Sequence, residues 1–276
     1  MIACFKDLVE AHPEILQDRH GLTFRGVQGA AEAFRRSGVV MLRQAFPTGV
    51  AEAARDAFDR SSAINPDGHR MPWEIRDGNE YPATGIISAL LRSWAWAVVE
   101  RLCGSRHIAI PLGYCVARNV IDRSLSVGAH QDAFGFGSGV PFSVWIPLQP
   151  IKPMETSGMG FMVPALDHVV PADKPDNIGR DAVLSDPAKL WIPTYEAGDV
   201  TIHSNLSPHF TTGYGTLSRR YSLEIRALRR LTAPMKYLDP AIYAARRDGR
   251  AVVSGTRYSG IAEAAPMLAA MKSAPS

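Results

Sequence analysis

Cysteine is scarce in this chain. The three cysteines, Cys4, Cys103 and Cys115, lie far apart and form no CxxC pair. Disulfide frameworks and zinc knuckles need cysteines at close or repeated spacings, so the pattern argues against both kinds of scaffold. This cysteine usage is typical of a protein kept in a reducing compartment.

An excess of charge of one sign is also missing. The sequence has 30 basic and 27 acidic residues, a net charge of +3, and its lysines and arginines are spread along the chain. Proteins that bind nucleic acid usually gather such residues into a basic patch, so we expect no nucleic-acid partner. One cluster, Arg226, Arg229 and Arg230, could meet an anionic substrate, although a solvated strand or helix end explains such a run more often.

No apolar stretch is both long enough and sufficiently free of charge to cross a membrane. The longest, residues 86–102, is interrupted by Arg92, Glu100 and Arg101, which is typical of a buried helix. The N-terminal segment is interrupted by Lys6, Asp7, Glu10 and His12, where a secretory signal would be apolar. We therefore expect a cytoplasmic protein with no membrane partner; the sequence carries no signal for its oligomeric state.

The expected elements come in the order helices first, strands afterwards. Apolar residues at helical spacing predict helices over 28–37, 50–61 and 86–103, with a β-branched strand, VVMLRQAF, between the first two. From residue 107 onwards short apolar runs alternate with turn residues, as in an antiparallel sandwich or barrel. After residue 231 the chain is rich in Ala, Arg and Gly, which predicts partly helical cover with a loose end at 272–276.

No internal repeat and no linker divides the chain. The hydrophobic fraction of 46% and the charged fraction of 21% are those of an ordinary globular protein. The sequence therefore predicts a single domain over residues 1–276, with an α+β, mainly β fold. Its parts are a helical cover over about 1–106, a β-core over about 107–230 and a C-terminal extension over 231–276.

The first residues with recognisable chemistry are His130, Gln131 and Asp132, which follow the strand-like segment CVARNVI and precede the glycine-rich FGFGSGV. On an extended strand the first and third of these side chains point to the same face. An imidazole and a carboxylate placed in this way could bind one cation together. Taken alone, such a triplet is more often an ordinary surface pair.

Two further histidines, His203 and His209, follow a Gly-Asp turn in the segment 198–226. Either histidine could complete a set of two nitrogens and one carboxylate oxygen. That set, with three positions left open, is the facial triad of non-haem iron(II) oxygenases. Further along, Arg220 and Ser222 could grip a dicarboxylate through a planar guanidinium and a hydroxyl. The alternative is that Arg219, Arg220 and Arg226 line an exposed edge strand.

Six segments in this order resemble the phytanoyl-CoA dioxygenase family, the PhyH-like branch of the iron/2-oxoglutarate oxygenases. They are FRRSGVVMLRQAF, HQDAFGF, SVWIPLQPI, SGMGFMVPALDH, GDVTIH and SPHFTTGYGTLSRRYS, which together span roughly residues 30–226. The order of the segments is far more specific than any one of them. The resemblance implies a double-stranded β-helix, the jelly-roll or cupin-like core, with helices from the N-terminal part packed against it.

The resemblance also implies roles for individual residues. His130, Asp132 and His209 match the family's iron ligands, and His203 falls in the preceding strand with a packing or supporting role. A second group of residues matches the family's 2-oxoglutarate site. It consists of Arg220 for the C5 carboxylate, Thr211 and Ser222 as hydroxyl partners, and Trp145 beside the cosubstrate.

The implied activity is that of an Fe(II)- and 2-oxoglutarate-dependent dioxygenase. Such an enzyme consumes O2, releases succinate and CO2, and oxidises an unactivated C–H bond, with hydroxylation as the expected outcome. We expect a small metabolite or natural-product intermediate as substrate, because no long basic tract suited to coenzyme A is present. Residues expected to flank the substrate are Trp73, Arg76, Arg118, Phe134 and Phe136, each of which has an ordinary packing or salt-bridge alternative.

The sequence departs from the family pattern at PALDH (164–168), where the family often has a PGSH-like turn. Because Asp132 is present rather than Ala or Gly, the chloride-binding variant of this chemistry is not expected. Two other readings stay open: a cupin-like metal-dependent isomerase or hydrolase, and a degenerate binding protein that kept the fold without catalysis.

Overall fold

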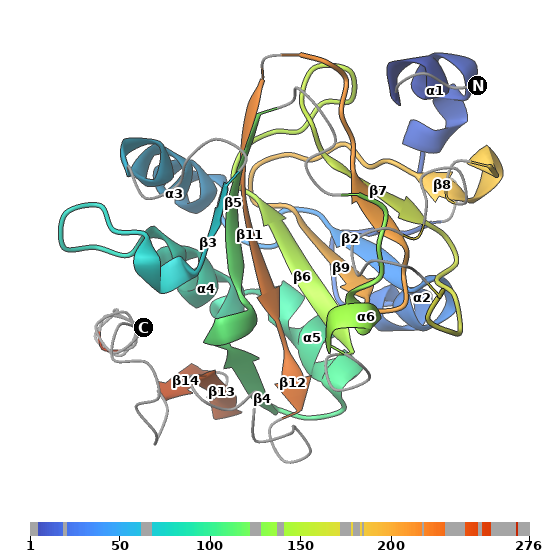
Figure 1. Cartoon of the computed structure of the whole chain (residues 1–276). Coiled ribbons are helices and arrows are strands. Elements are labelled where there is room, and N and C mark those ends of the chain that lie inside the picture. Colours follow the sequence, from blue (N-terminus) through green and yellow to red (C-terminus); the bar gives the residue numbers. More distant parts are fainter. Residues whose placement is uncertain are drawn as a thin grey trace.

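Two β-sheets of unequal size form the centre of the computed structural model (Figure 1). The structure describes residues 5–18, 21–61, 68–121, 128–136, 141–171, 178, 183, 185–216, 218–229, 241–247, 250–254 and 269. Within these residues the larger sheet has seven strands, in the order β1 (Thr23–Phe24), β2 (Val39–Leu42), β9 (Val200–Ser204), β6 (Phe142–Pro147), β11 (Arg219–Arg226), β5 (Val116–Ile121) and β3 (Gly68–Arg70). The smaller sheet has the order β10 (His209–Thr211), β7 (Met159–Met162) and β8 (Leu190–Trp191).

The chain passes repeatedly from one sheet to the other. It runs through β5 in the large sheet, then through a bridge at His130 that pairs with the edge of the small sheet at His209. It continues through β6 in the large sheet and through β7 and β8 in the small sheet. It then passes through β9 in the large sheet, β10 in the small sheet and β11 in the large sheet. As a result, β11 fills the place between β5 and β6, and residues far apart in the sequence become neighbours.

The inner faces of the two sheets pack through large apolar side chains. Trp145 on β6 lies edge-on to Tyr195, with ring centroids 5.0 Å apart, and Phe161 on β7 lies 6.2 Å from Trp191 on β8. Every residue of β6 is buried, as are all residues of β11 except the first. Along β11 polar and apolar residues alternate, yet both kinds are buried, because helices cover one face of the sheet and the small sheet covers the other.

Helices cover the outer face of the large sheet. They are α2 (Ala30–Ser37), α3 (Thr48–Arg60), α4 (Pro82–Arg92) and α5 (Trp94–Cys103). Their apolar faces share one core cluster with Leu223 and Ile225 of β11 and Val144 and Ile146 of β6. Side chains alternate along a strand, so Arg220, Ser222, Glu224 and Arg226 point to the opposite, inner face. The expected combination of a helical cover and a β-core is confirmed.

The remaining helical segments are short. They are α1 (Phe5–Ala11), α6 (Asp132–Phe136) and the 3₁₀ turns η1 (Pro13–Leu16), η2 (Pro72–Glu74), η3 (Leu112–Tyr114) and η5 (Pro187–Lys189). Helix α1 packs on the small sheet, where the Phe5 ring stacks on Phe210 with centroids 5.1 Å apart.

The single helix predicted over residues 86–103 is wrong, because two helices meet there at an angle of 77°. At the end of α4 the Ser93 hydroxyl donates to the Leu90 carbonyl, 2.8 Å away, and Ser93 is also the residue before α5, where its side chain makes no capping hydrogen bond. A serine that caps one helix in this way stops the backbone ladder from continuing. In the described part of the chain no single helix is long and apolar enough to span a membrane; the bent pair α4 and α5 meets that test by length and composition only.

The partly helical cover predicted after residue 231 is wrong over residues 241–247 and 250–254, although the described residue Ala269 is helical. Strands β13 (Ala241–Arg247) and β14 (Arg250–Ser254) pair antiparallel, and β13 pairs with β4 (His107–Pro111), which also pairs with β12 (Leu228–Arg229). Alanine and arginine rank high in helix propensity, but propensity is a small preference, and pairing with the edge of β4 outweighs it. The loose end predicted at 272–276 lies outside the described residues.

Candidate metal centre

Three predicted ligands converge between the two sheets. The ligand atoms of His130, Asp132 and His209 all lie within 4.8 Å of one another. His130 Nε2 is 3.9 Å from Asp132 Oδ1, and the His130 and His209 ring centroids are 4.1 Å apart. The two histidines exchange both backbone hydrogen bonds at 3.0 Å, which fixes their imidazoles side by side. The convergence expected from the sequence is therefore present in the fold.

The local geometry of the triplet differs from the strand that the sequence predicts. Only His130 is part of a β-bridge, whereas Asp132 is the first residue of α6. The backbone turns there because the Ala133 amide donates to the Asn205 carbonyl and the Phe134 amide donates to the Gln131 carbonyl. The carboxylate reaches the imidazole from a helix start rather than from the next position on a strand face.

Gln131, the residue between the two ligands, was not expected to have a role. Its side chain is 1% exposed and donates to the carbonyls of His168 and Leu206, at 3.0 and 2.8 Å. Its amide oxygen accepts from the Val170 backbone, at 2.8 Å. Gln131 therefore ties the metal triplet to the loop after β7 and to the turn before His209. The signal that the sequence does contain is the position of a glutamine between two predicted ligands.

Hydrogen bonds determine which nitrogen of each ligand histidine is available. The Nδ1 of His130 is 2.8 Å from the Gly128 carbonyl, and the Nδ1 of His209 is 2.9 Å from the Ser207 carbonyl. A carbonyl oxygen only accepts, so each Nδ1 carries the proton and each Nε2 presents a lone pair. Burial, followed by the neighbouring imidazoles of His130 and His203, holds the pKa of His209 well below its usual range. This donor set of two imidazoles and one carboxylate fits a divalent transition metal.

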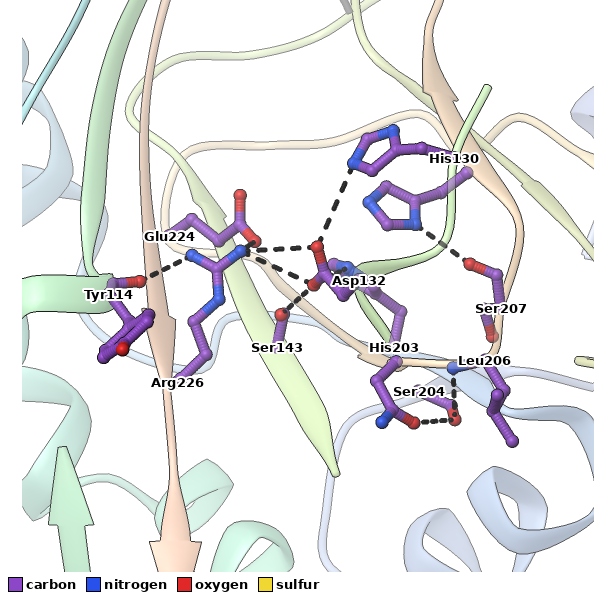
Figure 2. A network of polar contacts seen from close by, with 12 residues as sticks. Tyr114, His130, Asp132, Ser143, His203, Ser204, Leu206, Ser207, Glu224 and Arg226 are labelled. Atoms are coloured by element: carbon purple, nitrogen blue, oxygen red, sulfur yellow. Dashed lines mark hydrogen bonds and ion pairs between the residues drawn. The ribbon is translucent and has the colours of Figure 1, made fainter. Parts of the chain in front are cut away.

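The Asp132 carboxylate sits in a dense polar network (Figure 2). Its Oδ2 accepts a hydrogen bond from Ser143 Oγ at 2.5 Å and lies 3.7 Å from His203 Nε2. The Arg226 Nη2 is 3.5 Å from both carboxylate oxygens. Burial alone would raise the pKa of Asp132, but Arg226 and the two imidazoles of His203 and His209 outweigh it and hold the pKa well below its usual range. The carboxylate is therefore ionised and ready to bind a cation.

Arg226 is itself held from two sides. Its Nη2 lies 2.5 Å from Glu224 Oε1, and its Nη1 donates to the Tyr114 carbonyl at 2.7 Å. Burial would lower the pKa of the guanidinium, but Glu224 and Asp132 together raise it, so the charge is retained. The reading of Arg226 as a solvated strand end is wrong, because the residue is 4% exposed.

His203 belongs to β9, the strand before the one that begins with His209, as the resemblance implied. It is fully buried, and its ring lies 4.4 Å from that of His209 and 5.5 Å from that of Phe161. Within the described part of the chain neither ring nitrogen has a hydrogen-bond partner. A second set of possible ligand atoms, from Asp132, His203 and Glu224, also lies within 4.8 Å.

The residues expected to hold 2-oxoglutarate lie on the inner faces of both sheets. Arg220 and Ser222 are each 1% exposed on β11, which is a central strand, so the alternative of an exposed edge is wrong for Arg220. The Arg220 guanidinium carbon is 5.3 Å from the centroid of the Trp145 ring, and its Nη1 lies 3.4 Å from the Gly158 carbonyl. Thr211 on β10 is likewise 1% exposed.

Two further hydroxyls in this region were not expected from the sequence. Tyr195 OH and Thr201 Oγ1 are 2.7 Å apart, and both residues are fully buried. Burial raises the pKa of Tyr195, so its phenol stays protonated. Tyr195 contacts the Trp145 ring, which places this pair beside the arginine and tryptophan just described.

The residues expected to flank the substrate are dispersed. Trp73 is 6% exposed and belongs to the core under the helices, the packing role that the sequence also allowed. Arg76 is exposed and lies 5.3 Å from the Tyr81 ring centroid. Phe134 is 38% exposed two residues after Asp132, whereas the Phe136 side chain lies outside what the structure describes. Arg118 on β5 is half-buried and pairs in register with Ser222, so it faces inward.

Known proteins resemble this chain in structure rather than in sequence. No protein-family model matches it, and no curated protein sequence matches it. The epimerase SnoN, solved in complex with Fe3+, alpha ketoglutarate and nogalamycin RO, is 16% identical with a TM-score of 0.56, over 81% of this chain and 87% of SnoN. EvdO2 from Micromonospora carbonacea var. aurantiaca, complexed with 2-oxoglutarate, is 16% identical with a TM-score of 0.53, over 73% and 90%. The non-heme monooxygenase ThoJ, in its apo form, is 17% identical with a TM-score of 0.53, over 87% and 94%. The chain shares the fold of these proteins.

Proposed function

We propose that this chain is a non-haem iron(II)- and 2-oxoglutarate-dependent oxygenase. The observation that carries the proposal is the convergence of His130, Asp132 and His209, with both imidazoles presenting Nε2. The alternation of strands between the sheets is the order of a double-stranded β-helix, which supports the same class. Structural neighbours that were solved with Fe3+, alpha ketoglutarate or 2-oxoglutarate support it independently.

The second part of the proposal assigns 2-oxoglutarate to the inner face around Arg220. A buried guanidinium is a planar donor matched to a carboxylate, and Ser222 and Thr211 add hydroxyls within the same interior. Trp145 forms a flat wall against the arginine. A diacid anchored at its far carboxylate by Arg220 would direct its other end toward the ligand set. An isomerase or hydrolase that needs no diacid cosubstrate would have no use for this clamp.

Different residues of the proposed site would hold the metal, orient the cosubstrate and exclude water. Iron(II), when bound, would supply the site at which 2-oxoglutarate and O2 react, and the protein supplies geometry. His130, His209 and Asp132 would hold the metal from one face and leave the other positions open. Arg220 and Ser222 would orient the cosubstrate, and the buried lining around Trp145 and Tyr195 would exclude water.

The open side of the centre is the side of His130. Its side chain is 17% exposed, compared with 5% for Asp132, while His209 is 2% exposed. We therefore propose that the substrate approaches past His130, where Phe134 offers an exposed ring. Arg118 is the inward-facing cation that we assign to an anionic group of the substrate. Structural neighbours include an epimerase, a carbocyclase and a monooxygenase, so the position of the substrate would decide the outcome.

Three finer expectations belong to this proposal. The PhyH-like branch is favoured by the six ordered segments, which include both HQDAFGF and SPHFTTGYGTLSRRYS. A small metabolite or natural-product intermediate as substrate is consistent with the SnoN complex, in which nogalamycin RO is bound. A cytoplasmic location rests on the sparse, unpaired cysteines.

The test is iron binding together with succinate formation from 2-oxoglutarate. We expect His130→Ala, Asp132→Ala and His209→Ala to lose both, because each removes a ligand atom. His107→Ala is the matched control, since this histidine is exposed at the start of β4. Succinate formation by a metal-free preparation, or undiminished iron binding by His209→Ala, would contradict the proposal.

A further inference from the structure

Three polar side chains that contact Asp132 lie in one line across the large sheet. Arg226 on β11 is in register with Ser143 on β6, and Ser143 is in register with His203 on β9. Directly opposed residues on antiparallel strands point to the same face, so all three side chains project toward the small sheet. They are buried, at 4%, 0% and 0% exposure. We call these three residues the donor row (Figure 2).

The donor row contacts the two oxygens of Asp132 unequally. Ser143 and His203 both approach Oδ2, at 2.5 and 3.7 Å. Oδ1 is the oxygen that lies 3.9 Å from the Nε2 of His130. The arginine lies 3.5 Å from both oxygens. The contacts on Oδ2 therefore leave Oδ1 as the oxygen that faces the predicted metal position.

Asp132 also belongs to the competing set of ligand atoms with His203 and Glu224. Within the described residues no hydrogen bond fixes which ring nitrogen of His203 carries the proton, so the Nε2 that lies 3.7 Å from Asp132 Oδ2 would be available to a cation as a lone-pair donor. Arg226 Nη2 contacts both carboxylates of this set, at 2.5 Å to Glu224 and 3.5 Å to Asp132. The Arg226 guanidinium thus already supplies the positive charge that Asp132, His203 and Glu224 would otherwise draw from a metal ion.

We propose that the donor row makes Asp132 a one-oxygen ligand, and that Arg226 directs the metal to His130, Asp132 and His209 by filling the set of Asp132, His203 and Glu224. Ser143, His203 and Arg226 are then positioning residues, and Glu224 holds the arginine in place. The inference rests on the proposed function for the identity of the main ligand set. Its test uses metal binding alone, so it does not depend on turnover.

The test measures Co(II) binding and the Co(II) absorption spectrum in a series of variants. His209→Ala is expected to bind no Co(II) at the concentration that saturates the unmodified protein. Arg226→Met with His209→Ala is expected to regain Co(II) with a different spectrum, because the second set is now open. Adding Glu224→Gln to that double variant is expected to abolish binding again.

The conservative variant provides the control. Arg226→Lys with His209→Ala keeps a cation in the second set and should bind no Co(II). Failure of Arg226→Met with His209→Ala to bind Co(II), with a circular dichroism spectrum like that of the parent, would overturn the role of Arg226. Failure of the unmodified protein to bind Co(II) would instead overturn the proposed function.

A second measurement tests the one-oxygen role without changing any charge. Ser143→Ala removes the hydrogen bond on Oδ2 and should weaken Co(II) binding by about 10- to 100-fold, as loss of a partner of a ligand usually does. Its Co(II) spectrum should shift, and Ser143→Thr should restore both. An unchanged Co(II) affinity and spectrum in a folded Ser143→Ala protein would overturn the one-oxygen role of Asp132. This test stays valid if the Arg226→Met variants do not fold.

Discussion

Replacing Gly38 with alanine should damage both the stability of the fold and the metal centre. Gly38 ends α2 with a φ of +75°, and a Cβ there would lie 2.2 Å from the Ala165 Cβ and 2.9 Å from the Ser207 Oγ. The Gly38 carbonyl accepts from the Ser204 amide at 2.6 Å and from the Ser207 hydroxyl at 3.0 Å. These residues form the turn that leads from β9 to His209.

Two costs add up in Gly38→Ala. A residue with a Cβ costs about 1–2 kcal/mol in the left-handed region. Forcing a methyl group into a filled space costs about 1–3 kcal/mol more. We expect a loss of about 2–5 kcal/mol in the free energy of unfolding, a large part of the roughly 5–15 kcal/mol that holds a typical domain folded.

Gly104 provides a matched control. It ends α5 in the same way, with a φ of +58°, but nothing lies within 4 Å of the Cβ it would gain. Gly104→Ala should therefore incur only the backbone cost, about 1–2 kcal/mol. Urea denaturation measures both losses, and the difference between them isolates the collision with Ala165 and Ser207.

The affinity for Co(II) distinguishes damage to the turn before His209 from a general loss of stability. We expect Gly38→Ala to bind Co(II) more weakly than Gly104→Ala, because only the first displaces the turn before His209. Adding Ala165→Gly to Gly38→Ala should recover part of the lost stability by removing the nearest contact. Equal losses of stability in the two alanine variants, with equal Co(II) affinity, would refute the reasoning.

Two further predictions concern buried groups. Arg220→Ala should raise the 2-oxoglutarate concentration needed for half-maximal succinate formation by at least about 30-fold, since losing one partner of a buried charge pair costs about 2–5 kcal/mol. Its iron requirement should stay near that of the control Arg229→Ala, an exposed arginine on β12, and equal 2-oxoglutarate dependence in the two variants would show that the wrong arginine was chosen. Burial raises the thiol pKa of Cys103 and Cys115 to about 12, so in a Cys4→Ser background iodoacetamide at pH 8 should label neither in the folded protein and both after denaturation. Rapid labelling of the folded protein would contradict the burial of Cys115 and the partial burial of Cys103.

The sequence predicts the convergence of three side chains well, because they are identified from residue types in an ordered motif. His130, Asp132 and His209 lie together as expected. The local conformation at Asp132 was missed, since α6 begins through hydrogen bonds to Asn205 and within the loop. Asn205 comes from a distant part of the chain, which the local sequence does not show.

The donor row could not be predicted for a related reason. Its existence depends on the register between β11, β6 and β9, which is set by pairing across three non-consecutive strands. Nothing in the local sequence around Ser143 distinguishes it from other serines in apolar runs. A similar non-local pairing turned the alanine- and arginine-rich segment of β13 into a strand. Local propensity predicts such elements only where no distant partner competes.

The position of β11 between β5 and β6 has a consequence for biosynthesis. Protein chains emerge from the N-terminus, so His130, Asp132 and His209 are made before Glu224 and Arg226 exist. At that stage the large sheet lacks the strand between β5 and β6, and Asp132 lacks the guanidinium that lies beside it in the finished protein. On the proposed function, selective binding of the metal therefore has to wait until β11 has left the ribosome.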